Sequence, residues 1–272
     1  FETRVRKREM RYYVVADVHG FYTELVDALA EKGFFDDEGP RKLIVCGDLF
    51  DRGSEAKKLE SFICDLIEKD EVILIRGNHE DLAVELIDNI TKWMTYDIIS
   101  SHHWSNRTVD TLFQLSGLDL VEAYAYPEKL GTKMKKTPFY NQILPSMQDY
   151  YETKNYIFVH GWIPTDSLRL GGSYVYFYRD DWRNASKLER ESARWINGML
   201  AARQGVIEPG KTIVCGHWHC SYGHAEIGGK GSQFGIDADF TPYYDKGIIA
   251  IDGCTVHSGV VNCIIIEDDE LL

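Results

Sequence analysis

The sequence predicts an α/β fold built on buried parallel strands, and three observations lead to this prediction. Five short aliphatic runs show no alternation of polar and apolar residues, which is typical of strands covered on both faces. Amphipathic helical patterns lie between the first three runs. Asp17, Asp48 and Asn78 follow these runs at intervals of 31 and 30 residues, the length of a β–α–β unit.

Each predicted strand stops at residues with polar side chains, usually with a glycine beside them. The strands are 12–16, 42–46, 71–75, 156–159 and 212–215. The polar segments that follow them are 17–20, 47–48, 76–80, 160–161 and 216–219. Because right-handed crossovers place the carboxyl ends of parallel strands at one edge of a sheet, we expect the five polar ends to converge there.

Two helices are predicted between the first three strands. One has an apolar face whose members follow the spacing i, i+3, i+4, i+7 and i+8, namely Leu59, Phe62, Ile63, Leu66 and Ile67. The other is shorter and contains Leu25, Val26 and Leu29. We expect Thr23 to cap its start and Gly33 to end it.

The rest of the chain predicts an insertion and two more strands. Aromatic residues and scattered charges over about 85–155 indicate a mostly helical insertion that covers part of the site. Residues 247–252 and 260–267 are expected to be strands, joined as a hairpin through 257–259. Residues 1–272 are therefore predicted to form a single domain with one insertion.

Composition narrows the possible partners and the compartment. A formal charge of −13 argues against binding of nucleic acid, because affinity for the phosphate backbone comes from Lys and Arg. No apolar run reaches the roughly 20 residues of a membrane helix, so no membrane association is expected. The chain starts at Phe1 without methionine, which suggests trimming, and its first residues are charged, so no secretory signal is visible. We expect a cytoplasmic protein.

The six cysteines are expected to be buried thiols. Four of them lie in or beside aliphatic runs, and the sequence contains no CxxC pair. Disulfides and a thiolate zinc site are therefore the weaker interpretations.

The polar strand ends combine carboxylate, amide and imidazole groups. Such a mixed set suits manganese, iron or zinc, whereas magnesium and calcium prefer oxygen ligands alone. The sequence therefore predicts a site for divalent metal ions, with manganese as the first choice.

The motifs are similar to those of a known family. They are Asp17-x-His19-Gly20, Gly47-Asp48-x-x-Asp51-Arg52-Gly53, Arg76-Gly77-Asn78-His79-Glu80, His160-Gly161 and Gly216-His217. In this order they resemble the calcineurin-like metallophosphoesterases, and two of them resemble the PPP-type serine/threonine protein phosphatases, including bacterial and phage forms. The resemblance spans residues 17–219 and implies layered β-sheets flanked by helices.

The resemblance also implies a role for each residue. Asp17 and His19 would hold the first metal, Asp48 would bridge both, and the second would be held by Asn78, His160 and His217. His79 would act as general acid, with Asp51 fixing its imidazole, and Arg52 would grip the phosphate. Pairing of Asp51 with Arg52 at a loop surface is the alternative for those two residues.

Two features depart from the phosphatase pattern. The second phosphate-binding arginine of the family has no clear counterpart, because Arg179, Arg183, Arg194 and Arg203 compete for it. His219 follows His217 by two residues, which resembles the GHxH motif of the wider superfamily. Residues i and i+2 of an extended loop face the same way, so His219 is expected to complete the shell of the first metal. His102 and His103 are expected to be surface residues.

Three functions remain open at this point. The first is a phosphatase acting on phosphoserine or phosphothreonine in proteins. The second is a nucleotide hydrolase, in particular a symmetrical diadenosine tetraphosphatase, and the third is an inactive metal-binding scaffold. The expected partner is a phosphorylated protein, or a phosphorylated small molecule or nucleotide. An intact His79 and Asp51 argue against the scaffold, which needs no general acid.

Overall fold

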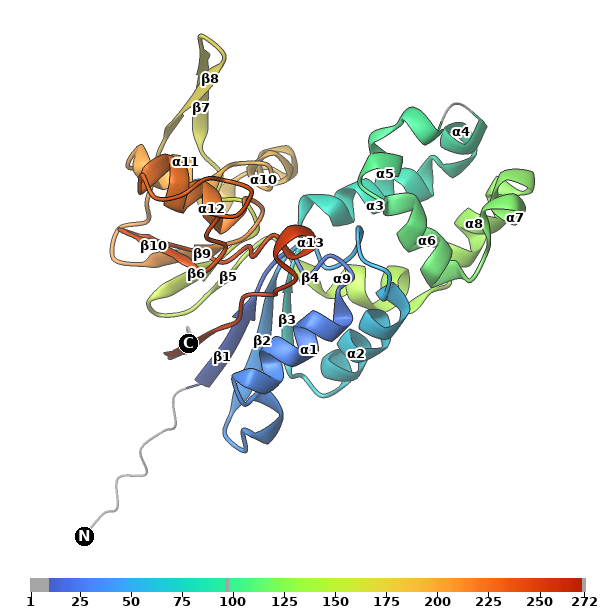
Figure 1. The fold of residues 1–272 in the computed structure, drawn as a ribbon, viewed down its shortest axis with the longest axis horizontal. Helices are drawn as coiled ribbons and strands as arrows, with labels where there is room; N and C mark the ends of the chain where they lie inside the picture. The colour runs from blue at the N-terminus through green and yellow to red at the C-terminus, as the bar shows by residue number, and fades with distance from the viewer. Residues whose placement is uncertain (1–9, 96–97, 271–272) are drawn as a thin grey trace.

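The computed structural model describes residues 10–95 and 98–270. It has two five-stranded sheets that pack face to face, with helices on their outer sides (Figure 1). The residues between the sheets form one apolar layer, which includes Val14 and Ile44 from one sheet and Phe158 and Val214 from the other. The prediction of layered sheets flanked by helices is confirmed.

The first sheet has the strand order β12-β1-β2-β3-β4. Its strands are β1 (Met10–Val15), β2 (Arg41–Cys46), β3 (Val72–Ile75), β4 (Met147–Gln148) and β12 (Ile264–Asp268). The strands β1 to β4 run parallel, and β12 pairs antiparallel with β1. The first three predicted strands are therefore neighbours.

The second sheet has the order β10-β11-β9-β6-β5. Its strands are β5 (Tyr151–Glu152), β6 (Tyr156–Phe158), β9 (Thr212–Cys215), β10 (Tyr243–Asp245) and β11 (Ile248–Ala250). The expectation that all five predicted strands share one sheet was wrong, since β6 and β9 belong here. A run of apolar residues shows that both faces of a strand are covered, but not whether a helix or another sheet covers them.

The predicted helices form on the first sheet as α1 (Tyr22–Glu31) and α2 (Ala56–Glu68). Thr23 does not cap α1, because its N–H and its hydroxyl both donate to the Glu55 carboxylate, at 3.0 and 3.1 Å. Gly33 does end the helix, in the left-handed conformation with φ of 80°. The short helix η1 (Phe34–Asp36) follows.

A group of helices follows β3 and packs beside the first sheet (Figure 1). They are α3 (Asn78–Asp88), α4 (Ile90–Thr95), η2 (Ile98–Ser100), α5 (His102–Ser105), α6 (Thr108–Ser116), α7 (Leu120–Ala125), α8 (Pro127–Met134), η3 (Phe139–Ile143) and α9 (Leu144–Ser146). Leu112, Leu130 and Phe139 join the same core as Val15 and Val45 of the sheet. This packing fixes α3, and with it Asn78 and His79, against the strand ends.

The C-terminal half adds elements around the second sheet. They are β7 (Asp166–Leu170), β8 (Ser173–Phe177), η4 (Trp182–Asn184), α10 (Lys187–Ala193), α11 (Gly198–Arg203), α12 (Cys220–Tyr222), η5 (Gly223–Ile227) and α13 (Thr255–Ser258). The predicted hairpin at 257–259 was wrong, because helix α13 separates β11 in one sheet from β12 in the other. Both strands were recognisable as apolar runs, but their pairing partners are remote in sequence.

Two expectations from composition can be compared with the fold. All six cysteines are free thiols, as predicted. Five of them are buried, whereas Cys254 is partly exposed, contrary to expectation. In the described ranges, no helix combines the length and the apolar character needed to cross a membrane.

Candidate metal centre

The five polar strand ends meet at a common edge of the two stacked sheets. His160, which follows β6, places its Nε2 2.8 Å from Oδ1 of Asn78, which follows β3. The backbone N–H of His217, which follows β9, donates to Oδ2 of Asp17 at 2.8 Å. The expected convergence therefore occurs, although the strand ends come from two sheets.

Asp48 lies at the middle of this cluster. Its Oδ2 is 3.8 Å from Nε2 of both His19 and His79, and its Oδ1 is 3.3 Å from Nε2 of His160. Asp48 therefore belongs to two groups of potential metal ligands, one with His19 and His79 and the other with His160 and His217. Asp48 is 2 % exposed, so both groups form around a buried carboxylate.

The backbone at the cluster is strained. Among the described residues, nine other than glycine have positive φ, and six of these are Asp17, His19, Asp48, Asp51, Arg52 and His217. Such conformations cost energy and persist where the surrounding structure imposes them, which is common at functional sites.

The glycines next to the cluster permit close approach of the chain. A Cβ atom on Gly77 would lie 2.1 Å from Oδ1 of Asp48, and one on Gly216 would lie 2.0 Å from Oδ2 of Asp17. Any other residue at these positions would displace a carboxylate. This explains why glycines accompany the polar strand ends in the sequence.

Glu80 holds two of the strand ends together. Its carboxylate accepts hydrogen bonds from the backbone N–H groups of Asp48, Leu49 and Gly77 at 3.1, 2.9 and 2.8 Å. The carboxylate is fully buried, and burial together with the charge of Asp48 raises its pKa. Glu80 belongs to the 76–80 motif, but its role as an acceptor for two loops could not be recognised from the sequence.

His79 is paired with Asp51. Nδ1 of His79 lies 2.7 Å from Oδ2 of Asp51, and the same oxygen accepts a hydrogen bond from the hydroxyl of Thr108 at 2.7 Å. The hydroxyl of Thr111 accepts the Asp51 N–H at 3.1 Å. Helix α6, which carries both threonines, therefore orients the pair, a contribution that the sequence analysis did not identify.

Arg52 lies on the other side of the same imidazole. Its Nη2 is 3.5 Å from Nε2 of His79. Asp51 makes its contacts with His79 and with α6, so the alternative of an Asp51–Arg52 surface pair has no support in these contacts. The guanidinium and the imidazole are thus placed to act on one ligand.

The bonds of two buried histidines define their tautomers. Nδ1 of His19 lies 2.9 Å from the carbonyl of Phe50, and Nδ1 of His160 lies 2.8 Å from the carbonyl of Cys46. A carbonyl only accepts, so Nδ1 carries a hydrogen in both rings, and Nε2 of His19 keeps a lone pair. Nε2 of His160 also lies 2.8 Å from the acceptor Oδ1 of Asn78, a contact that needs a second hydrogen, and although burial opposes it, the charge of Asp48 raises the pKa of His160. Both Nε2 atoms face Asp48, which is the arrangement of a histidine ready to bind a metal.

Burial keeps two of the histidines neutral. It lowers the pKa of His19 well below its usual value, helped by the charge of His79, and it lowers the pKa of His217 to about 3, helped by the charge of His160. A neutral imidazole is the form that binds metals.

A carboxylate that the sequence analysis missed lies beside the cluster. Burial raises the pKa of Asp252 to about 6, although the N–H of Cys254 and the charge of Arg52 oppose this. Burial also raises the pKa of Asp17 well above its usual range, with the charges of Asp252 and Asp48 adding to the effect. The signal was present, since Asp252 and Gly253 follow the apolar run of β11 in the same way as the other strand ends.

His219 is not brought into either group of potential ligands among the described residues. Its Nδ1 lies 2.7 Å from Oγ of Ser221, and that hydroxyl donates to the carbonyl of Gln233 at 2.6 Å. Ser221 therefore accepts the Nδ1 hydrogen, which leaves Nε2 of His219 as the nitrogen able to bind a metal. The ring packs against Phe234, with centroids 4.6 Å apart.

His103 is not a surface residue, contrary to expectation. It is fully buried, and its Nε2 lies 2.5 Å from Oε2 of Glu85. The ring also contacts Trp93 at 4.8 Å. It is therefore part of the packing of the helical group.

Most of the arginines considered for a second phosphate contact form ion pairs with carboxylates of the protein. Arg179 pairs with Glu189, Arg183 with Glu152 and Arg194 with Asp81. Arg76 also pairs with a carboxylate, that of Asp81, at 2.7 Å.

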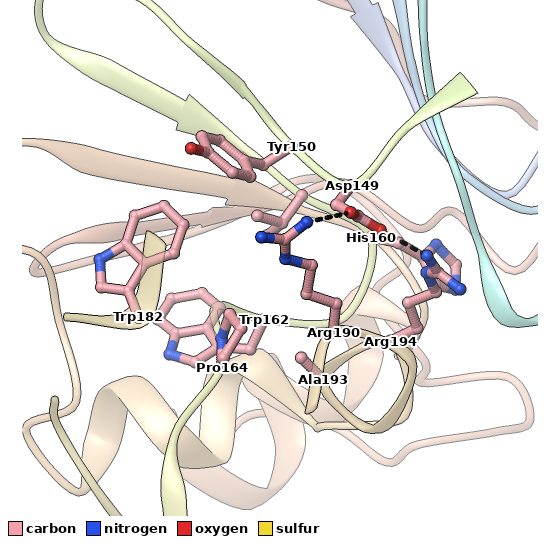
Figure 2. A pocket seen from close by; sticks show the side chains of 10 residues that line it. Asp149, Tyr150, His160, Trp162, Pro164, Trp182, Arg190, Ala193 and Arg194 are labelled. Carbon is pink, nitrogen blue, oxygen red and sulfur yellow. Dashed lines mark hydrogen bonds and ion pairs between the residues drawn. The ribbon is translucent and has the colours of Figure 1, made fainter. Parts of the chain in front are cut away.

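Figure 2 shows Asp149 between Arg190 and Arg194, beside His160. The cavity there has a volume of about 20 Å³, which suits a single water molecule. Both arginines are therefore occupied by Asp149, next to His160. None of the arginines is assigned as the second phosphate-binding residue.

The donor set fits divalent metal ions. It combines buried carboxylates, one amide oxygen and imidazole Nε2 atoms that face Asp48. The pKa of Asp17 is raised by its burial and by the charges of Asp252 and Asp48, so a cation would offset the repulsion among these carboxylates. Carboxylate and imidazole together suit manganese, iron and zinc.

Comparison with known proteins gives the family. The sequence profile of the family described as "Calcineurin-like phosphoesterase" matches residues 10–221. The chain is 26% identical over 214 residues to serine/threonine-protein phosphatase 2 of Salmonella typhimurium, covering 77% of this chain and 80% of that protein.

A second group of relatives matches over a shorter region. The chain is 26% identical over 119 residues to the asymmetrical bis(5'-nucleosyl)-tetraphosphatase PrpE of Bacillus velezensis, covering 42% of this chain and 45% of that protein. A homologue of the same name from Halalkalibacterium halodurans is matched over 52% of its length. The chain thus spans about half the length of these relatives.

A solved structure agrees with the fold. The cold-active protein-tyrosine phosphatase of a psychrophilic Shewanella species superposes with a TM-score of 0.50 and 15% identity, covering 95% of this chain and 76% of that one. At this identity the likeness concerns the fold alone. The profile match extends over the residues of the cluster from Asp17 to His219, and the chain belongs to the calcineurin-like phosphoesterase family.

Proposed function

We propose that this chain hydrolyses phosphate monoesters with two divalent metal ions. The observation that carries the proposal is the position of Asp48 in both groups of potential ligands. We assign the first ion to Asp17, His19 and Asp48, and the second to Asp48, Asn78, His160 and His217. Manganese is the first choice, with iron and zinc as alternatives.

The ions, when bound, would neutralise the phosphoryl oxygens and make a water molecule a better nucleophile. Arg52 would bind the phosphate through its planar guanidinium, since its Nη2 lies 3.5 Å from Nε2 of His79 beside the cluster. Glu80 would keep Asp48 in position, because it ties the backbone of the two loops that carry Asp48 and Asn78.

His79 would supply the proton for the leaving group. Burial lowers the pKa of His79, but the charge of Asp48 and the hydrogen bond with Asp51 outweigh it, so the pKa is raised overall. A raised pKa keeps a proton on the imidazole near neutral pH. Asp51 and Thr108 would fix the ring so that Nε2 faces the substrate.

This acid supports esters of alcohols as substrates. An alkoxide is a poor leaving group and needs a proton, whereas the phosphate released from an anhydride needs it much less. An inactive scaffold would gain nothing from a buried His79–Asp51 pair.

Two classes of monoester fit the site. Phosphoserine and phosphothreonine in proteins are supported by the similarity to the Salmonella phosphatase, which extends over most of both chains. Nucleotides are the second class, and they are suggested by the similarity to the proteins named PrpE, although the tetraphosphate in that name is cleaved at an anhydride and not at a monoester. That name is asymmetrical, whereas the sequence predicted a symmetrical enzyme.

Hydrolysis assays with a panel of substrates test the proposal. The protein is treated with a chelator, and Mn²⁺ is then added back in the presence of p-nitrophenyl phosphate, a phosphoserine peptide or a dinucleoside polyphosphate. We expect no turnover after chelation and recovery with Mn²⁺ on the monoesters. Activity that survives exhaustive chelation would contradict the two-metal proposal, and absence of turnover on every substrate would favour the scaffold.

A further inference from the structure

An open groove lies between the β7–β8 hairpin and helix α10. Its volume is about 490 Å³, and its walls include Tyr174 and Tyr176 of β8, Leu188 of α10 and Trp195 just after that helix. A concave site of this size, largely apolar with a few polar groups, is typical of small-molecule binding.

The two tyrosines form a flat wall. They are two residues apart on β8, so their rings lie on one face of the hairpin, with centroids 6.0 Å apart and planes inclined by 12°. Gly171 and Gly172 form the turn of the hairpin, with φ of 56° and 91°.

The side chain of Gln204 holds this strand in place. It accepts the N–H of Tyr176 at 2.7 Å and donates to the carbonyl of Tyr174 at 3.1 Å. The backbone of β8 is therefore fixed on the body of the protein, and the tyrosine rings form a built surface.

Trp195 connects the groove with the metal centre. Its ring is 54 % exposed and packs edge-on against the ring of His217, with centroids 5.9 Å apart. The preceding Arg194 is paired with Asp81 of α3, so this wall is anchored to the helix that carries His79.

The groove has the wrong charge for a second phosphate. Among the described residues that line it, Glu189 is the one charged side chain, and it is already held by Arg179 and by the N–H of Ser186. Thr165 offers a hydroxyl whose Oγ1 is buried and has no hydrogen-bond partner among the described residues. A flat, uncharged group with polar edges matches these walls.

We propose that this groove binds the base of a nucleotide whose phosphate lies at the metal centre. The inference rests on the proposed hydrolysis and selects the nucleotide class of substrate. A base and the phosphate of a nucleoside monophosphate are separated by one sugar, and Trp195 is a wall of the groove that also touches His217. Bases stack on aromatic rings whatever their identity, so a preference for nucleotides over other phosphate esters is expected.

A matched pair of substrates tests the inference. Adenosine 5'-monophosphate and ribose 5-phosphate carry the same primary phosphate ester and differ in the base. We expect kcat/KM to be about 10-fold or more higher for the nucleotide, since base stacking on an aromatic side chain gives roughly 5- to 100-fold in affinity. Equal values of kcat/KM for the two substrates would overturn the groove proposal while leaving the hydrolysis intact.

Variants of the tyrosines localise the effect. Tyr174→Ser with Tyr176→Ser should remove most of the preference by lowering kcat/KM for the nucleotide, with ribose 5-phosphate unaffected. The double change to Phe should keep the preference, because the rings remain. Tyr126→Ser is the matched control, since Tyr126 is 57 % exposed and lies between α7 and α8, two helices that Figure 1 shows away from the hairpin.

The remaining outcomes are also decisive. Inhibition of ribose 5-phosphate hydrolysis by adenosine gives a binding readout, and it should weaken in the Ser variant, whose folding is checked by circular dichroism. If the Ser variant instead slows hydrolysis of a phosphoserine peptide and leaves the nucleotide unchanged, the groove binds peptide and the proposal is wrong. The wild type with Mn²⁺ could instead hydrolyse the phosphoserine peptide but neither adenosine 5'-monophosphate nor ribose 5-phosphate. That result would exclude nucleotides as substrates and leave the two-metal function standing.

Discussion

Nδ1 of His79 lies 2.7 Å from Oδ2 of Asp51, while the neighbouring Asn78 directs its Oδ1 to His160 at 2.8 Å. Two consecutive residues of one helix start therefore face different partners. We infer a division of labour in which Asn78 binds metal and His79 transfers a proton.

Replacement of His79 tests this division. His79→Asn should leave two metals bound and slow hydrolysis of an alkyl ester such as phosphoserine by roughly 10²- to 10⁴-fold. The loss should be much smaller for p-nitrophenyl phosphate, because nitrophenolate leaves without a proton. Asp51→Asn should have the same pattern but a weaker effect. The His79 ring keeps a hydrogen-bond acceptor at position 51 but no longer has a negative charge beside it. Equal losses on both esters, or loss of metal, would show that His79 has another role.

Asp48 is predicted to be the bridging ligand. Loss of a residue that supports a metal ligand typically lowers metal affinity by about 10- to 100-fold. Asp48→Asn removes a proposed ligand itself, so metal affinity should fall by more than this, and activity should fall with it. Metal content per chain is measured by atomic emission after dialysis. Asp70→Asn is the matched control, because Asp70 also has positive φ and lies in an exposed turn after α2. Full occupancy of both sites in the Asp48 variant would place the bridge elsewhere.

Glu80 is predicted to be structural. In Glu80→Gln, one of the two oxygens becomes an NH₂ group, so at least one of the three backbone N–H groups loses its acceptor. An unsatisfied buried group costs about 1–3 kcal/mol, so the free energy of unfolding of the metal-free protein should fall by that amount. The exposed Glu68 on α2 provides the control Glu68→Gln. Unchanged stability on urea denaturation would mean that the loops do not depend on this carboxylate.

Glu152 is predicted to contribute to acid sensitivity. Burial alone would raise its pKa, but hydrogen bonds from Arg183 and Lys211 outweigh this and lower it. A lowered pKa means that the stabilisation is fully present above the usual value of about 4.3 and is lost as pH falls through the folded-state value. Glu152→Gln should therefore lower the Tm of metal-free protein at pH 7, and the difference from wild type should shrink below about pH 4. A constant difference across this range, or one matched by the control Glu31→Gln, would contradict the prediction.

His219 remains a predicted ligand of the first metal. The tautomer set by Ser221 leaves its Nε2 free, but the ring is outside both groups of potential ligands. If His219 binds metal, His219→Ala should reduce the metal content below two per chain. An unchanged metal content would restrict the shell to the residues around Asp48.

The expected cytoplasmic location, the single-domain organisation and the physiological substrate also stay predictions. Phosphoprotein and nucleotide substrates differ in what surrounds the phosphate. Under the groove proposal, the surroundings of the metal cluster are where the choice between them would be made.

The sequence by itself determined the strands and the identity of the residues at their ends. Apolar runs such as those before Asp48 and His160 are local features of the sequence. The need for glycine next to the Asp17 and Asp48 carboxylates is a local steric requirement. Both can therefore be recognised in the sequence without knowledge of the fold. Asp252 followed the same local pattern and was within reach of this reasoning.

Only the tertiary structure decided how these pieces combine. Two sheets rather than one bring the strand ends together, because burial of both faces does not specify what covers them. Thr108 orients Asp51 from 57 residues away, and Trp195 joins the groove to His217, through contacts that have no periodicity in the sequence. Hydrogen bonds and ring contacts between distant segments depend on the packed arrangement of the whole chain. That arrangement sets the His79–Asp51 pair, the position of Glu80 and the shape of the groove.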